Sequence, residues 1–179
     1  SYKREYSTLW NNNNLRFHLR ILLIEFLGQL SAPEDFEANW LLPHLENTQY
    51  RRRILSCMER RHGGFNLITD TYLPMFMSLP PEEAFEIVFL LKSALSFNKD
   101  KVLSLIDKYW MNDTSKDHLS LLVLNQLKEW DERPLTMACQ ILERTDVADY
   151  FIDSLSSLVS ENAPELAPRI VKAYLNHCL

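Results

Sequence analysis

The chain has 179 residues, of which 46% are apolar, and a formal net charge of −5. This length and apolar content suit a globular domain with a buried core, while the negative charge means that affinity for nucleic acid requires a local basic patch. Only 3 glycines occur, which argues against β-rich and dinucleotide-binding folds, because hairpins and phosphate-binding loops need glycine at positive φ.

Ten apolar clusters follow one another along the chain, each separated from the next by about one helix and one short turn. Their centres are Leu23, Leu41, Leu55, Tyr72, Leu90, Leu105, Leu122, Cys139, Leu155 and Val171. Segments 15–30, 85–95 and 119–130 are apolar on most sides, as in helices sandwiched between others, whereas 100–110 and 134–144 have one apolar stripe. The pattern predicts helices arranged in pairs.

Short motifs mark the ends of several of these helices. SAPE at 31–34 and TSKD at 114–117 predict helix starts with capping boxes, and PPEE at 80–83 places proline and acids in a first turn, where they favour the helix dipole. HGG at 62–64 predicts a helix stop.

Three prolines lie at related positions within the apolar clusters. Pro43 and Pro74 are 31 residues apart, and Pro168 follows after about three more intervals of that length. A proline inside a helix removes one backbone hydrogen bond and bends the axis. A repeat of this length predicts a solenoid of helix pairs.

The segment Trp40-Leu-Leu-Pro-His-Leu-Glu-Asn, followed by Arg52-Arg-Ile-Leu, resembles a HEAT repeat, which has a proline in its first helix and a basic position in its second. The segments 73–95 and 166–175 match the first-helix pattern, whereas the units near Leu103 and Met137 lack the proline. The resemblance implies a right-handed stack of α-hairpins with a concave binding surface.

A second resemblance is narrower. The segments 17–30, 40–45 and 127–131 look like the helical-repeat regions of large bacterial NACHT-type (STAND) ATPases. In that family the repeats sense a trigger or hold the ATPase inactive. No Walker motif occurs in this chain, so the resemblance assigns it no ATPase residues.

Motifs for catalysis and metal binding are weak. Glu59 and His62 form a lone ExxH, and there is no HExxH, CxxC or glycine-flanked serine. Cys57, Cys139 and Cys178 are far apart in apolar helical contexts, which predicts small buried hydrophobic side chains in a reducing compartment. We therefore expect no cofactor, no metal site and no catalysis by this segment alone.

The basic residues are concentrated near the N-terminus, where residues 1–62 carry 9 Lys/Arg and 7 Asp/Glu, whereas residues 63–179 carry 10 and 17. On a helix, Arg53, Arg60 and Arg61 share a sector beside His62, so they could bind phosphates. The alternative is a solvated ridge with one arginine pairing to a neighbouring carboxylate. Tryptophans near helix ends either wedge between repeats or anchor a partner.

The sequence thus predicts one all-α domain over residues 1–179, a right-handed α-α superhelix (HEAT-like solenoid) of about five helix pairs. We expect a cytoplasmic fragment of a larger protein, without membrane contact, that binds a protein partner or another domain of the same chain as a scaffold or sensor-regulatory segment. The alternative is nucleic-acid binding through the Arg51–Arg61 cluster. The candidate partner-binding residues are Arg51, Arg53, Arg60, Arg61, His62, Trp110 and Trp130.

Overall fold

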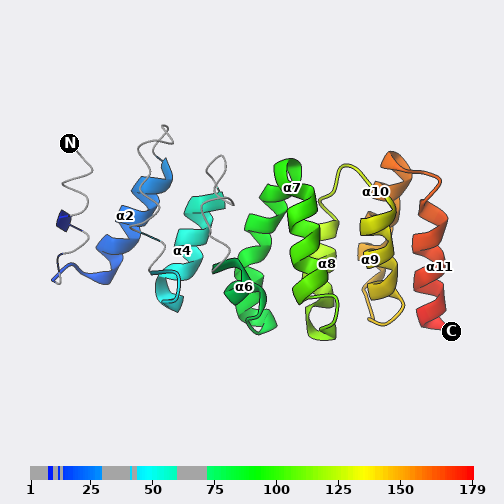
Figure 1. Cartoon of the computed structure of the whole chain (residues 1–179), viewed down its shortest axis with the longest axis horizontal. Coiled ribbons are helices and arrows are strands. Elements are labelled where there is room, and N and C mark those ends of the chain that lie inside the picture. The colour runs from blue at the N-terminus through cyan, green and yellow to red at the C-terminus, as the bar shows by residue number, and fades with distance from the viewer. Residues whose placement is uncertain (1–7, 10–11, 13, 30–40, 42–43, 60–71) are drawn as a thin grey trace. The chain divides into compact units, whose positions relative to one another are not determined.

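A computed structural model describes residues 8–9, 12, 14–29, 41, 44–59 and 72–179. The chain divides into two compact units, unit 1 (Ser1–Leu73) and unit 2 (Pro74–Leu179), which we treat separately. All regular elements in the described residues are helical. They are α2 (Phe17–Gln29), α4 (Thr48–Glu59), α6 (Tyr72–Met77), α7 (Pro81–Tyr109), the 3₁₀ turn η3 (Thr114–Lys116), α8 (Asp117–Leu124), α9 (Glu132–Leu142), α10 (Asp149–Asn162) and α11 (Ala167–Cys178) (Figure 1).

The two described helices of unit 1, α2 and α4, pack against each other. Ile24 on α2 and Ile54 on α4 are fully buried, and Phe17 stacks on Tyr50 with their ring centroids 5.3 Å apart. Phe26 remains 48% exposed, so α2 carries apolar side chains both inside and outside this contact. This distribution fits its lack of a single apolar stripe in the sequence.

In unit 2, α7 begins as the sequence predicts, with Pro81 at its first position and Glu82 and Glu83 in its first turn. The two predicted helices 85–95 and 100–110 run on as one element, interrupted at Asn98, whose φ of −142° and ψ of 40° are not helical. Figure 1 shows the two arms of α7 meeting at an angle. The break lets the second arm turn away from the line of the first.

The remaining helices of unit 2 follow in chain order, with α7 packed on α8, α8 on α9, and both α9 and α10 on α11. Polar contacts link residues 29 to 37 positions apart along this array. These pairs are Asn125 with Ser154, Lys99 with Asp131, and Glu132 with Arg169. Each of these pairs therefore connects segments of the chain that are separated by one intervening helix.

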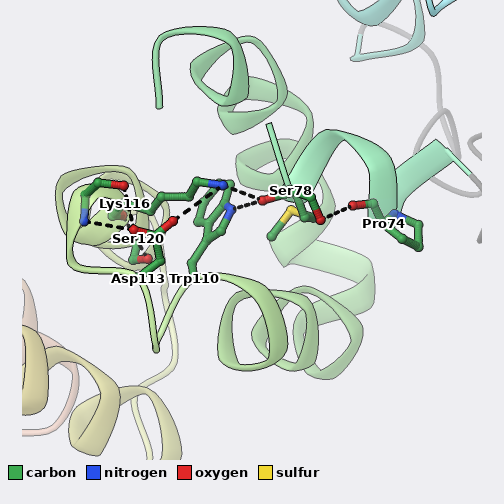
Figure 2. A network of polar contacts seen from close by, with 8 residues as sticks. Pro74, Ser78, Trp110, Asp113, Lys116 and Ser120 are labelled. Carbon is green, nitrogen blue, oxygen red and sulfur yellow. Dashed lines mark hydrogen bonds and ion pairs between the residues drawn. The ribbon is translucent and has the colours of Figure 1, made fainter. Parts of the chain in front are cut away.

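A buried polar network fixes the C-terminal end of α6 in unit 2. The indole nitrogen of Trp110 and the ammonium of Lys116 both donate to the carbonyl oxygen of Met77, at 2.9 and 2.7 Å, as Figure 2 shows. Burial lowers the pKa of Lys116, and the Asp113 carboxylate, 3.9 Å away, opposes that shift. Met77 is a helix-end residue, so these donors satisfy a carbonyl that has no partner within the helix.

A second network joins the start of α8 to the end of α9. Asp117 is fully buried, and its carboxylate accepts two hydrogen bonds from Arg144, at 2.9 and 2.5 Å, and one from the hydroxyl of Thr145. The hydrogen bonds that Arg144 donates to the Asp117 carboxylate raise the pKa of Arg144. A two-bond pairing of this kind compensates a carboxylate for its lost hydration.

All ten predicted helix centres lie in helical residues, but two boundaries were wrong. Asp113, rather than Thr114, caps the segment after α7 by accepting from the amide of Ser115, and α8 starts only at Asp117. The helix predicted to reach residue 130 ends at Leu124. The predicted starts at 31–34 and the stop at 62–64 lie outside the described residues.

Two further features concern surface and burial. Of the three cysteines, Cys57 is buried, Cys139 is partly buried and Cys178 is exposed, so the prediction of burial was wrong for Cys178, the last residue of α11. No helix among the described residues has both the length and the apolar content needed to span a bilayer.

Candidate functional site: a groove in unit 2

The structure places Arg51, the first residue of the predicted basic cluster, inside unit 1 with only 5% exposure. Its guanidinium donates to the carbonyl oxygens of Leu45 (3.0 Å) and Glu46 (3.3 Å). These carbonyls lie in the turn before α4, so Arg51 holds that turn against the helix that follows it. A side chain engaged in this way does not offer its charge to a partner.

Arg53 is exposed, and its guanidinium donates to the carboxylate of Glu25 on α2 at 2.9 Å. This matches the alternative in which one arginine of the cluster pairs with a neighbouring carboxylate. Arg60, Arg61 and His62 lie outside the described residues. The described part of the predicted cluster therefore does not form an open basic groove.

The two candidate tryptophans are also interior. Trp110 is fully buried and donates to Met77, while Trp130 is 8% exposed. Within the described residues, the indole nitrogen of Trp130 has no hydrogen-bond partner. Both side chains act as core wedges in unit 2, the first of the two roles that the sequence suggests for tryptophans near helix ends, and neither is placed to anchor a partner.

Unit 2 instead has a groove of about 630 Å³, which we call the α7 groove. One wall is the end of the first arm of α7, including Lys92, Leu95 and Phe97, and the other is the turn 126–129 after α8, including Leu127 and Lys128. This volume is in the range of pockets that bind ligands or anchor side chains. Because Leu127 is buried and Phe97 is 44% exposed, the groove has an apolar floor and an aromatic rim.

Lys99 connects the two walls of the α7 groove. Its ammonium donates to the carbonyl oxygen of Glu129 at 3.0 Å and to the carboxylate of Asp131 at 2.7 Å. The hydrogen bond from Lys99 is the main reason that the pKa of Asp131 is lowered. Lys99 follows the break at Asn98, so the non-helical residue directs this side chain across to the turn.

The charge of the α7 groove is locally positive. Lys92, Lys99 and Lys128 line it, with Glu129 as the acidic residue among the lining side chains. The Lys99 charge is engaged by Asp131, whereas no ion pair is found for Lys92 or Lys128 within the described residues. Lys128 is exposed and Lys92 is partly exposed, so both ammonium groups are accessible from solvent.

An aromatic strip leads along α7 to the groove. Phe85 and Phe89, one helical turn apart, are 43% and 46% exposed, and their rings meet edge to face with centroids 5.7 Å apart. The Lys92 ammonium lies 5.8 Å from the ring centroid of Phe89. With Phe97 at the end of the same arm, α7 carries three exposed aromatic side chains beside accessible lysines.

Sequence reasoning missed the α7 groove, although a signal was present. The segment 85–95 was interpreted as apolar on most sides and therefore sandwiched, but Phe85 and Phe89 on its outer face are solvent-exposed. The spacing of four between them marks one face of a helix. The lysines gave no such signal, because Lys128 follows Lys92 by more than thirty residues and only the fold brings the two together.

A smaller groove of about 420 Å³ lies between the second arm of α7 and α9. Its charged residues are already paired, since Arg133 lies 3.9 Å from the carboxylate of Asp107 and Glu132 accepts from Arg169. The described residues contain no cluster of three or more His, Cys, Asp or Glu side chains that could hold a metal ion. The α7 groove is thus the stronger candidate site.

Comparisons with protein-family models, with curated proteins and with solved structures gave no match to this chain.

Proposed function

We propose that this chain is a non-catalytic helical-repeat segment that binds a protein partner, or another domain of its own chain, through the α7 groove and the adjoining aromatic strip. The observation that carries the proposal is the combination of Phe85, Phe89 and Phe97, each more than 40% exposed, with an adjacent groove. Exposed aromatic side chains beside a concavity are typical of protein-binding surfaces.

As part of this proposal, the helices form a right-handed, HEAT-like superhelix of about five pairs. Supporting it, long-range polar links in unit 2 join residues 27 to 39 positions apart, a range that includes the spacing of 31 between Pro43 and Pro74. Contacts between each repeat and the next are the property that defines a solenoid. In such an array the α7 groove lies where two successive repeats meet.

A sensor or regulatory role in a STAND-type ATPase is a narrower form of this proposal. Its support is the resemblance of segments 17–30, 40–45 and 127–131. The described structure does not favour the nucleic-acid alternative, because Arg51 is buried against carbonyl groups and Arg53 is paired with Glu25.

Photo-crosslinking tests the proposed function. The full chain, carrying benzoylphenylalanine in place of Phe97 (Phe97→benzoylphenylalanine), is expressed in the cells that make the protein and irradiated, and adducts are resolved by mass spectrometry. We expect a discrete protein adduct that survives nuclease treatment and is lost when Phe85→Ala and Phe89→Ala are added. The same photoreactive residue at Lys172 on α11 serves as the control position.

Absence of a protein adduct at position 97, or equal labelling at 97 and 172, would overturn the proposed function. Adducts that are lost on nuclease treatment would show that this surface binds nucleic acid instead of a protein.

A further inference from the structure

We infer that the partner segment bound in the α7 groove is an acidic peptide with large apolar side chains. This inference rests on the proposed function and adds to it the chemistry of the partner. It follows from three features of the groove, namely its accessible ammonium groups, its apolar floor, and the charge of the surrounding unit.

The first feature is the pair of ammonium groups at Lys92 and Lys128, one on each wall of the groove. The described residues provide no carboxylate partner for either, while Asp131 already engages Lys99. Two positive charges facing a shared groove favour a ligand with at least two carboxylates. Opposite charges across an interface mainly fix its specificity and register, so the lysines select an acidic segment.

The second feature is apolar. Leu95 and Leu127 are nearly fully buried in the floor of the groove, and the exposed ring of Phe97 stands beside them. A leucine or phenylalanine of the partner inserted here would cover the exposed part of Phe97 and remove further apolar surface from water. The aromatic strip of Phe85 and Phe89 extends the apolar contact by further turns of the helix.

The third feature separates a peptide from a nucleic acid. Residues 74–179 carry 10 Lys/Arg and 16 Asp/Glu, so unit 2 is negative outside the groove. A nucleic-acid strand carries a charge at every phosphate and extends beyond the groove into this negative field. A peptide with a few carboxylates matches two lysines and presents less charge to the rest of the surface.

The test is a binding screen of the full chain against an array of peptides of about twelve residues, long enough to cross a groove of this size. One set combines Asp and Glu with Leu and Phe in varied order, and a matched set replaces each acid by its amide. Hits are measured in solution by fluorescence anisotropy, with a labelled oligothymidine of similar length as the nucleic-acid probe.

We expect binding by members of the acidic set and at least about tenfold weaker binding by their amide counterparts. Lys92→Glu combined with Lys128→Glu should weaken the best acidic peptide by about tenfold or more, because two attractions become repulsions. The control variant, Lys108→Glu with Lys172→Glu, changes the net charge equally away from the groove and should bind within about twofold of the unaltered chain. Circular dichroism establishes that both variants are folded.

The inference is overturned if the acidic and amide peptides bind alike, if neither set binds, or if the two charge-reversal variants behave identically. Preferential binding of oligothymidine would also overturn it. These results can be distinguished from a failure of the proposed protein-binding function. A protein adduct at position 97 that is insensitive to the two lysine substitutions would leave protein binding in place and remove only its acidic character.

Discussion

Arg51 and Arg53 on α4 differ from Lys92 and Lys128 of the α7 groove in what their charges contact. On α4, Arg51 donates to the carbonyl oxygens of Leu45 and Glu46, and Arg53 donates to the carboxylate of Glu25, so both side chains form hydrogen bonds within the protein. Around the groove, Lys99 is engaged in the same manner, whereas Lys92 and Lys128 face solvent without an ion pair among the described residues. A basic run in the sequence therefore does not show by itself which of its charges are accessible, since Arg51 is buried whereas its neighbour Arg52 is exposed.

The same comparison holds for the aromatic residues. Trp110 is buried in the core of unit 2, and its indole nitrogen donates a hydrogen bond to the carbonyl oxygen of Met77. Phe85 and Phe89, in contrast, lie on the outer face of α7. Tryptophan attracts attention as an interaction anchor, but here phenylalanine is the exposed residue. The difference teaches that exposure, rather than residue type, identifies the candidate surface.

The largest expected effect tests the structural use of Arg51. Arg51→Ala removes the donors to the carbonyls of Leu45 and Glu46 and leaves a buried gap, so we expect a loss of about 2 kcal/mol in the free energy of unfolding. Urea denaturation followed by circular dichroism measures it, with hydrogen exchange of the α4 amides as the local readout. The exposed neighbour Arg52 provides the control, since Arg52→Ala should change stability by less than about 0.5 kcal/mol.

Equal losses for Arg51→Ala and Arg52→Ala would mean that Arg51 does not hold the turn before α4.

The next effect concerns Lys99, which lines the groove but, like Arg51, forms its hydrogen bonds within the protein. Lys99→Ala breaks the contacts with Glu129 and Asp131, and because these groups are partly exposed we expect a loss of about 1 kcal/mol. Release of the turn should also weaken acidic-peptide binding about threefold through lost pre-organisation. Denaturation and anisotropy titrations measure the two effects.

Lys128→Ala, on the same turn, is the control for stability. A stability loss as large as that of Lys99→Ala would contradict the distinction between engaged and accessible lysines.

The pH dependence of the Lys99–Asp131 pair gives a smaller effect. The pKa of Asp131 is lowered in the folded chain, so its stabilisation is fully present above the ordinary value of 3.8 and is lost as pH falls through the depressed folded value. Asp131→Asn keeps an N-cap residue at α9 and should cost about 0.5 kcal/mol at neutral pH, after allowance for solvent exposure.

Urea midpoints of the unaltered chain and Asp131→Asn should therefore converge in acid. If the difference between the two midpoints stays constant from neutral pH into the acid range, the Lys99–Asp131 ion pair is not the cause of that difference.

The smallest stability effects are expected at the accessible charges. Arg53→Ala breaks an exposed bridge, and Lys92→Ala with Lys128→Ala removes side chains that have no ion pair among the described residues, so each should shift stability by no more than about 0.5 kcal/mol. Their effects on binding should differ sharply, since only the lysine pair should weaken the acidic peptides. Denaturation and anisotropy measurements test both the stability and the binding expectations. Weaker binding of the acidic peptides by Arg53→Ala would contradict the proposed difference between α4 and the α7 groove.

Sequence by itself determined which residues become helical. The ten residues that apolar periodicity predicted as helix centres are all helical, and the PPEE motif marks the start of α7, because these signals act within one or two turns of chain. Local signals failed where distant residues compete. Leu127 and Trp130 continue the apolar spacing of α8, but α8 ends at Leu124 and both residues are buried in the segment that follows it. Lys99 of α7 donates to Glu129 in that segment, a contact that local spacing does not reveal.

Only the tertiary structure decided which charged and aromatic side chains remain accessible. Arg51 and Lys92 each carry one positive charge, but Arg51 lies within hydrogen-bonding distance of carbonyl groups in the turn before it and Lys92 lies on the open wall of a groove. The wall on which Lys92 lies forms only because the fold brings α7 and the turn after α8 together, and solvent exposure is set by position in space rather than along the chain. For this reason the sequence predicted a binding role, while the α7 groove emerged only once the helices were packed.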